Sequence, residues 1–363
     1  MALYNLSAEQ SVLGSILIEP ESILVANQFN LGVDDFFHQQ HQILYNCIKK
    51  MDGQDMIKLA NEVKATVLDS PCVDDLFVDA SDISLDTTPS PSIETGFAPL
   101  DAATSGGLNF GTLTVLTGSP GSGKSTFLNQ ILANALSLGF NSFLYSGELT
   151  AQMALDWFYK TVANPIHLSF GVNSFGKTIK VTDEGVLQIN KWLKNKLFLF
   201  SKNAQADETN ISTVIEFLAV KKDVKLFVLD NLMTIECSGS DKYEKQINVI
   251  KSLKNLAKHY NIVIILVAHS NKNSIMRREP HVFDISGASE IANLSDYILN
   301  ATRDNDVENE TTILLLKNRI TGLIKKHLQL KFSPDRKRFY TDSKLELERD
   351  YGYGEVYEQE SFC

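Results

Sequence analysis

The sequence predicts an α/β protein built on a mainly parallel, doubly wound sheet, preceded by a small all-α N-terminal domain. A glycine-rich loop stands between a predicted strand and a predicted helix within residues 112–136. Apolar, β-branched runs then alternate with helical patterns through the second half of the chain, as they do where crossover helices join parallel strands. Residues 1–67 carry helical periodicity instead, which sets them apart as a separate unit.

Composition limits the function classes. The 363 residues allow one large and one small domain, and 44% of them are hydrophobic, as in globular proteins with a full core. No apolar run reaches the roughly 18 residues of a membrane-spanning helix, and residues 1–5 do not resemble a secretory signal. The four cysteines form no C-x-x-C pair, which favours a reducing, cytoplasmic setting over a disulfide or zinc framework.

Charge is unevenly distributed. The formal net charge is −10, but a nucleic-acid site needs only a local basic lining. No lysine or arginine occurs between Lys64 and Lys124, whereas the second half carries many. An anionic partner is therefore expected to meet the second half of the chain.

Residues 1–67 are expected to form the helical domain. Ser7 and Gln10 have the spacing of a capping box, and helices are predicted near 7–17, 22–27, 39–51 and 54–67. Residues 68–94 are acidic and contain Pro89 and Pro91, which predicts a linker. The ATPase-type core is then expected over 95–344.

The central motif matches G-x-x-x-x-G-K-[ST], the phosphate-binding loop of nucleoside triphosphatases. Its residues are Gly118, Ser119, Pro120, Gly121, Ser122, Gly123, Lys124, Ser125 and Thr126. The glycines let successive N–H groups face phosphate oxygens at a helix N-terminus. Lys124 is expected to reach the β- and γ-phosphates of ATP or another NTP or dNTP, and Ser125 to bind Mg²⁺. The alternative is a chance glycine turn before a helix.

Further strands are predicted at 142–146, 197–200, 226–229, 262–267, 297–302, 312–316 and 329–332. Polar residues stand where three of them end: Glu148, Asp230 and His269. Ligands bind at the carboxyl ends of strands in such sheets, so Asp230 is expected to hold Mg²⁺ in a Walker-B arrangement. Glu148 could instead cap the helix predicted over 149–159, and His269 could be structural.

Two stretches then resemble a known family. "LSAEQSVLGSILIEPESI" and the residues up to about position 50 resemble the N-terminal domain of DnaB-type replicative helicases. "TGFAPLDAATSGGLNFGTLTVLTGSPGSGKST" resembles the entry into a RecA-type ATPase core. The resemblance implies a RecA-like P-loop NTPase fold, a hexameric ring around single-stranded DNA, and 5′→3′ movement driven by hydrolysis.

The resemblance also implies roles for single residues. Glu148 would be the general base, and His269 a γ-phosphate sensor like the histidine of the phage helicase–primase and mitochondrial Twinkle branch. Leu316–Gly322 resembles the segment that ring helicases insert into a neighbour's active site, with Arg319 as arginine finger and Lys317 as its companion. Arg303 and Phe332 match positions that sandwich the nucleotide base. A basic strand end, a surface arginine and a core phenylalanine are the plain alternatives.

The loop over 271–287 corresponds to the DNA-binding loop of ring helicases, whose usual Arg-Glu before Ser-Gly is replaced here by Asp284-Ile285. Lysine, arginine and backbone N–H groups suit a sequence-independent grip on phosphates. An ordinary solvated basic loop is the alternative. The expected DNA contacts are Lys272, Arg277, Arg278, Ser286 and Gly287.

The last segment, 345–363, is acidic and aromatic and is expected to be disordered. It resembles the polymerase-docking tail of phage helicases, although a solubilising tail fits equally. Replication forks, a primase and a helicase loader are the further partners that the family implies, and no membrane partner is expected. A RecA/RadA-like recombinase or recombination mediator, and a KaiC-like ATPase that does not act on DNA, are the rival interpretations.

Overall fold

The computed structural model describes residues 6–18, 22–50, 91–174, 176–236, 242–269, 280–282, 288–303, 309–324, 326–341 and 344–354. The chain divides into two compact units, Met1–Thr88 and Pro89–Cys363. No described helix is long and apolar enough to cross a membrane.

The smaller unit is helical, as predicted. It contains α1 (Leu6–Ile18), α2 (Ser22–Gln28) and α3 (Gln39–Lys50). Its core consists of Leu13, Ile16, Phe36, Leu44, Tyr45 and Ile48. Glu9 accepts the N–H of Phe37 at 2.7 Å and lies 2.7 Å from His41, so α1 is tied to the turn before α3. The helix expected near 54–67 lies outside the described residues.

The larger unit is built on a nine-stranded sheet of order β13-β12-β11-β10-β3-β9-β8-β4-β7. The predicted α/β class is confirmed: β10, β3, β9, β8, β4 and β7 pair in parallel. Their bounds are β3 (Thr112–Gly118), β4 (Asn141–Ser146), β7 (Leu197–Leu199), β8 (Val224–Asp230), β9 (Val263–Val267) and β10 (Tyr297–Arg303).

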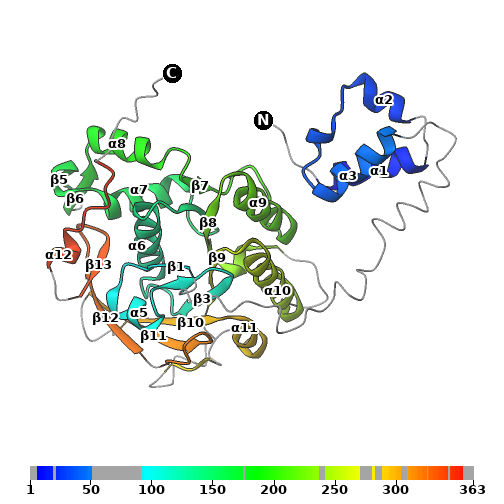
Figure 1. Ribbon diagram of the computed structural model, residues 1–363. Coiled ribbons are helices and arrows are strands. Elements are labelled where there is room, and N and C mark those ends of the chain that lie inside the picture. The colour runs from blue at the N-terminus through cyan, green and yellow to red at the C-terminus, as the bar shows by residue number, and fades with distance from the viewer. Residues whose placement is uncertain are drawn as a thin grey trace. The chain divides into compact units, whose positions relative to one another are not determined.

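Helices cover both faces of this sheet (Figure 1). On one face, α6 (Lys124–Ser137), α7 (Ala151–Val162) and α8 (Asp183–Leu193) share a core with alternate strand residues. On the other, α9 (Glu208–Lys221), α10 (Lys242–Tyr260) and α11 (Ala288–Leu294) pack on the intervening residues. Val115 and Leu116 illustrate this alternation, since they are both fully buried but on opposite faces. The strands are therefore apolar throughout, as parallel strands buried on both sides must be.

The last strands form an antiparallel edge. β11 (Glu310–Asn318), β12 (Lys326–Ser333) and β13 (Arg338–Tyr340) follow β10 in a meander. No described helix separates them, and strands joined without a crossover helix pair antiparallel. The sequence did not predict β13, the short pair β1 (Ser92–Ile93) and β2 (Leu108–Asn109), or the hairpin β5 (Leu168–Asn173) and β6 (Gly176–Val181). α5 (Ala98–Ala103) lies between β1 and β2.

The expected linker boundary at residue 94 is wrong by a few residues. Ile93 and Thr95 are fully buried in the larger unit. Asp101 accepts hydrogen bonds from the backbone N–H and the hydroxyl of Thr95, both at 2.7 Å. The chain therefore joins the larger unit at β1, before the motif-bearing core begins.

The prediction that 345–363 is disordered is wrong for residues 345–354. Tyr351 and Tyr353 are buried, and the Tyr353 hydroxyl lies 2.5 Å from His167. Arg338 is fully buried and donates to the carbonyls of Leu347 at 3.0 Å and Arg349 at 2.8 Å. A buried guanidinium requires acceptors, and this acidic segment, including α12 (Lys344–Leu347), supplies them. Residues 355–363 lie outside the described part of the chain.

Candidate nucleotide-binding site

The glycine loop joins the carboxyl end of β3 to the first turn of α6. Gly118, Gly121 and Gly123 have φ values of 143°, 75° and 87°, a region that side chains other than glycine rarely enter. Space excludes a side chain as well: a Cβ on Gly118 would lie 2.1 Å from the Ala301 carbonyl, and one on Gly123 would lie 2.4 Å from Phe339 Cζ. The loop thus brings backbone N–H groups together at a helix N-terminus, where anions bind.

Lys124 folds back over the loop. Its Nζ donates to the carbonyls of Gly118 at 3.0 Å and Ser119 at 2.8 Å. Burial lowers the pKa of the Lys124 ammonium, while Asp230 and Glu148 act to raise it. A buried ammonium held by neutral carbonyls is suited to exchange those partners for phosphate oxygens.

Ser125 and Asp230 come from sequence positions far apart and meet at the loop. Ser125 Oγ donates to Asp230 Oδ2 at 2.9 Å. Burial raises the pKa of Asp230, the bond from Ser125 lowers it, and Glu148 raises it. A hydroxyl and a carboxylate in contact beside a phosphate site fit Mg²⁺, which binds one or two protein oxygens together with phosphates and water.

Glu148, Asn231 and His269 form a second polar cluster at the ends of β4, β8 and β9. Asn231 Nδ2 donates to Glu148 Oε1 and lies 3.1 Å from His269 Nε2, and His269 Nε2 lies 3.4 Å from Glu148 Oε1. The Asn231 side-chain oxygen accepts the Met233 N–H at 2.9 Å, which orients its NH₂ group toward the other two residues. Sequence reasoning missed Asn231, although its position directly after Asp230 could have drawn attention to it.

These groups line one pocket of about 490 Å³, a volume ordinary for a small-molecule site. The two residues expected to flank a base, Arg303 and Phe332, both line it, together with Trp157 and Phe339. Lys337 Nζ lies 4.6 Å from the centre of the Trp157 ring and 5.7 Å from that of Phe332. Trp157 was not predicted, because its contact with the pocket depends on how α7 packs.

Lys317 and Arg319 lie elsewhere. β11 runs antiparallel to β10, so Thr311 pairs with Arg303 at the pocket end, and Asn318 pairs with Tyr297 at the opposite end. Arg319 donates its backbone N–H to the Asp296 carbonyl at 2.8 Å, and the Asp296 N–H donates to the Leu113 carbonyl at the start of β3. At ~3.3 Å per residue, the start of β3 is roughly 17 Å from the glycine loop. The structure therefore does not bring Arg319 to the pocket of its own chain.

The expected DNA contacts Lys272, Arg277, Arg278, Ser286 and Gly287 all lie outside the described residues. Among the described residues, no group of three or more His, Cys, Asp or Glu side chains could hold a metal ion. A metal at Ser125 and Asp230 would thus depend on oxygens of the bound nucleotide.

A glycine loop at the end of a buried parallel strand, with a serine facing a Walker-B aspartate, defines the P-loop nucleoside triphosphatase class. The more particular assignment comes from comparison. The family description "DnaB-like helicase C terminal domain" matches residues 92–341, and "DnaB-like helicase N terminal domain" matches residues 1–68. The chain belongs to the DnaB-like helicase family, whose ATPase domain implies binding of a nucleoside triphosphate.

Individual relatives are distant. A probable replicative DNA helicase of Trieres chinensis is 25% identical over 270 residues, covering 68% of this chain and 57% of that protein. The DNA repair protein RadA of Escherichia coli is 26% identical over 198 residues, covering 53% of this chain and 34% of that protein. The chain thus spans about half the length, or less, of the curated relatives it matches.

Two solved structures share the fold. The ATPase domain of a phage helicase aligns with a TM-score of 0.58 at 16% identity, covering 81% of this chain and 100% of that one. A DnaB-like replicative helicase, described with its interactions with primase, aligns with a TM-score of 0.59 at 16% identity, covering 92% and 99%. The RecA-like core with a helical N-terminal region is thereby confirmed.

Proposed function

We propose that this chain is a replicative DNA helicase that couples ATP hydrolysis to movement along single-stranded DNA and to unwinding of forks. Family membership supports the activity, and the two matched regions together span most of the chain. The observation that carries the proposal is the separation of Arg319 from the phosphate loop of its own chain. An arginine finger so placed acts only on a neighbouring subunit, and this calls for a ring such as a hexamer.

Hydrolysis would use the pocket groups in distinct roles. The loop N–H groups and Lys124 bind the triphosphate, and Ser125 and Asp230 would hold Mg²⁺. Bound Mg²⁺ would supply neutralisation of charge on the phosphates. Glu148 accepts a proton from the attacking water or orients it, an effect typically of about 10²–10⁴-fold. Asn231 fixes the carboxylate, and His269, in contact with the same amide, senses the phosphate end of the pocket.

Base recognition would fall to the far wall of the pocket. Arg303 and Phe332 line it from β10 and β12. A guanidinium and an aromatic ring can each stack on a nucleobase. Such stacking is tolerant of base identity, so several nucleoside triphosphates should bind.

The neighbour's active site would be completed by Arg319, with Lys317 beside it on the finger segment. Arg319→Ala should lower kcat by roughly 10³–10⁵-fold and leave the KM for ATP within about twofold, because a finger acts mainly on the transition state. Turnover by Arg319→Ala at the wild-type rate would remove the trans assignment. Lys124→Ala is the matched comparison, since it should abolish nucleotide binding itself.

DNA contact is assigned to the loop over 271–287, with Lys272 and the Gly287 region first. Single-stranded DNA should stimulate ATP turnover, and a forked duplex should be unwound 5′→3′. A primase, a loader and a polymerase are proposed partners, the polymerase through residues 355–363.

The rival functions make different predictions. The RadA match keeps a recombination protein as the second candidate, and strand exchange without unwinding would favour it. Hydrolysis indifferent to DNA would favour a KaiC-like ATPase. One fork-unwinding assay and one ATPase assay with and without single-stranded DNA separate all of these.

A further inference from the structure

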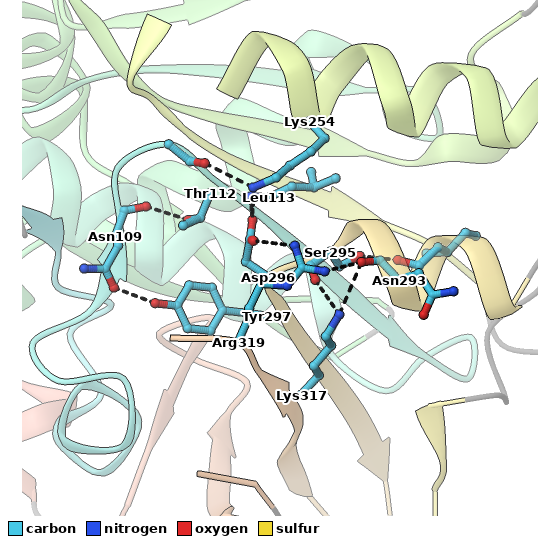
Figure 2. Close-up of polar contacts among 12 residues, drawn as sticks. Asn109, Thr112, Leu113, Lys254, Asn293, Ser295, Asp296, Tyr297, Lys317 and Arg319 are labelled. Atoms are coloured by element: carbon cyan, nitrogen blue, oxygen red, sulfur yellow. Dashed lines mark hydrogen bonds and ion pairs between the residues drawn. The ribbon is translucent and has the colours of Figure 1, made fainter. Parts of the chain in front are cut away.

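Asp296 is a buried carboxylate at which three distant segments of the ATPase unit meet. It is 3% exposed and directly precedes β10. Its Oδ2 accepts the backbone N–H of Leu113 at 2.8 Å and an ion-pair hydrogen bond from Lys254 Nζ, and its Oδ1 accepts from Arg319 Nη1 at 3.3 Å. Figure 2 shows the carboxylate between these groups, with Lys254 on one side and Arg319 on the other.

The charges in this cluster are not equivalent. Lys254 is 7% exposed and donates also to the Gly111 carbonyl at 3.2 Å. It is the buried partner that makes an ionised Asp296 tolerable in the interior, since a buried charge must be paired. The Arg319 side chain is 46% exposed, so charge balance inside the protein does not require it. The contact instead fixes Arg319.

Arg319 is anchored at both its main chain and its side chain. Its N–H donates to the Asp296 carbonyl at 2.8 Å, and Nη2 donates to the Asn293 carbonyl. Arginine has five N–H donors in a rigid fork, and the two side-chain contacts occupy one donor each. The remaining ones have no acceptor within the described part of the chain. The guanidinium is therefore held in one orientation with donors left for a further anion.

Lys317 is tied to the same junction. Its Nζ donates to the carbonyls of Ala292 at 2.5 Å and Ser295 at 2.8 Å. The residues between α11 and β10 thus hold the whole finger segment, and Figure 2 shows both cations directed at this junction.

We infer that Asp296 is a positioning residue for the action of Arg319 on a neighbouring subunit: it holds the guanidinium in its reactive orientation before the neighbour's nucleotide arrives. This inference rests on the trans role of Arg319 proposed above. Pre-organisation matters because a free arginine side chain must lose rotamer freedom when it binds. Asp296 touches no part of the nucleotide pocket of its own chain, so its effect must pass through Arg319 or through β3.

The variant Asp296→Asn keeps an acceptor for Leu113 but leaves the Lys254 ammonium buried and unpaired. The second variant, Asp296→Asn with Lys254→Met, removes both charges together and is expected to fold. Its kcat for ATP with single-stranded DNA should fall on the order of 10- to 100-fold, as expected for a lost charged hydrogen bond, with KM within about twofold. Arg319→Ala should fall further.

Mixed rings decide whether the effect acts in trans. Subunits with the double substitution retain an intact phosphate loop, and Lys124→Ala subunits retain an intact finger. Mixing them equally should restore turnover at roughly a quarter of the subunit interfaces. The mixture of Arg319→Ala with Lys124→Ala is the positive control.

Each outcome is informative. Wild-type kcat in the double variant overturns the inference. So does a low kcat that mixing does not restore while the Arg319→Ala control is restored, because Asp296 would then act within its own subunit through β3. If the control mixture itself is not restored, the trans site of the proposed function fails instead.

Discussion

Replacing Asn231 tests whether the cluster beside the phosphate loop is organised for chemistry. The Asn231 amide donates to Glu148 and contacts His269, and its oxygen is fixed by the Met233 N–H. Asn231 is 1% exposed and is not among the residues lining the nucleotide pocket. Its removal should therefore disturb the general base without removing a nucleotide contact.

The expected magnitude follows from the hydrogen bond that is lost. A bond to a charged group contributes about 1.5–3 kcal/mol. Because the Glu148 side chain is 57% exposed, the lower part of that range applies, about 1.5–2 kcal/mol. At about 1.36 kcal/mol per tenfold change in rate, Asn231→Ala should lower kcat roughly 10- to 30-fold with little change in KM. The Met233 N–H also loses its acceptor, which should lower the free energy of unfolding by about 1–3 kcal/mol.

Asn231→Ser separates the two effects. Asn231 caps the short helix Leu232–Thr234 through its side-chain oxygen, and serine is an equally good cap but is too short to reach Glu148. This variant should unfold at nearly the wild-type temperature yet show the same loss of kcat as Asn231→Ala. Steady-state ATP turnover with saturating single-stranded DNA and a thermal melt provide both values. If Asn231→Ser recovers turnover together with stability, the amide is only a cap and the reasoning fails.

Three further predictions concern the loop, the core and the DNA contact. Gly123→Ala should lose nucleotide affinity and about 1–2 kcal/mol of stability, whereas Gly139→Ala, with a similar φ of 90° and no atom within 4 Å of its Cβ, should lose only stability; equal nucleotide affinities would contradict this. Burial raises the pKa of Tyr297 to about 12; because the unfolded phenol titrates near 10, the folded protein retains a proton that the unfolded chain has lost, and stability should fall by up to about 1.4 kcal/mol per pH unit between pH ~10 and ~12. Denaturant melts of Tyr297→Phe should lack this component, and an identical pH slope in both proteins would refute it. Lys272→Ala should weaken single-stranded DNA binding evenly across sequences and flatten its salt dependence, and an unchanged salt slope would remove Lys272 from the interface.

The sequence was sufficient for features that depend on a few neighbouring residues. The glycine loop, the strand before it and the helix after it are local patterns, and all three lie where they were expected. The expectation of disorder for the C-terminal segment failed because composition does not reveal that the buried Arg338 takes its acceptors from the carbonyls of Leu347 and Arg349.

The roles of individual site residues remain predictions, but their placement is a matter of tertiary structure. Arg303 and Phe332 are 29 positions apart in the numbering, and the antiparallel edge brings both to the nucleotide pocket. Trp157 joins them only because α7 packs beside α6. Periodicity within a segment contains no information about such neighbours.

By itself, the sequence determined the class of the protein: a phosphate-binding loop in an alternating α/β chain, with a helical unit before it. Only the tertiary structure decided that Asn231 lies between Glu148 and His269, and that Arg319 lies at the edge of the sheet opposite the phosphate loop. The physical reason is that a motif is made by hydrogen bonds and sterics between adjacent residues, whereas strand order and direction are set by the packing of two hydrophobic faces across the whole sheet. The direction of β11 is a consequence of that packing, and it places Arg319 beyond the reach of its own nucleotide pocket.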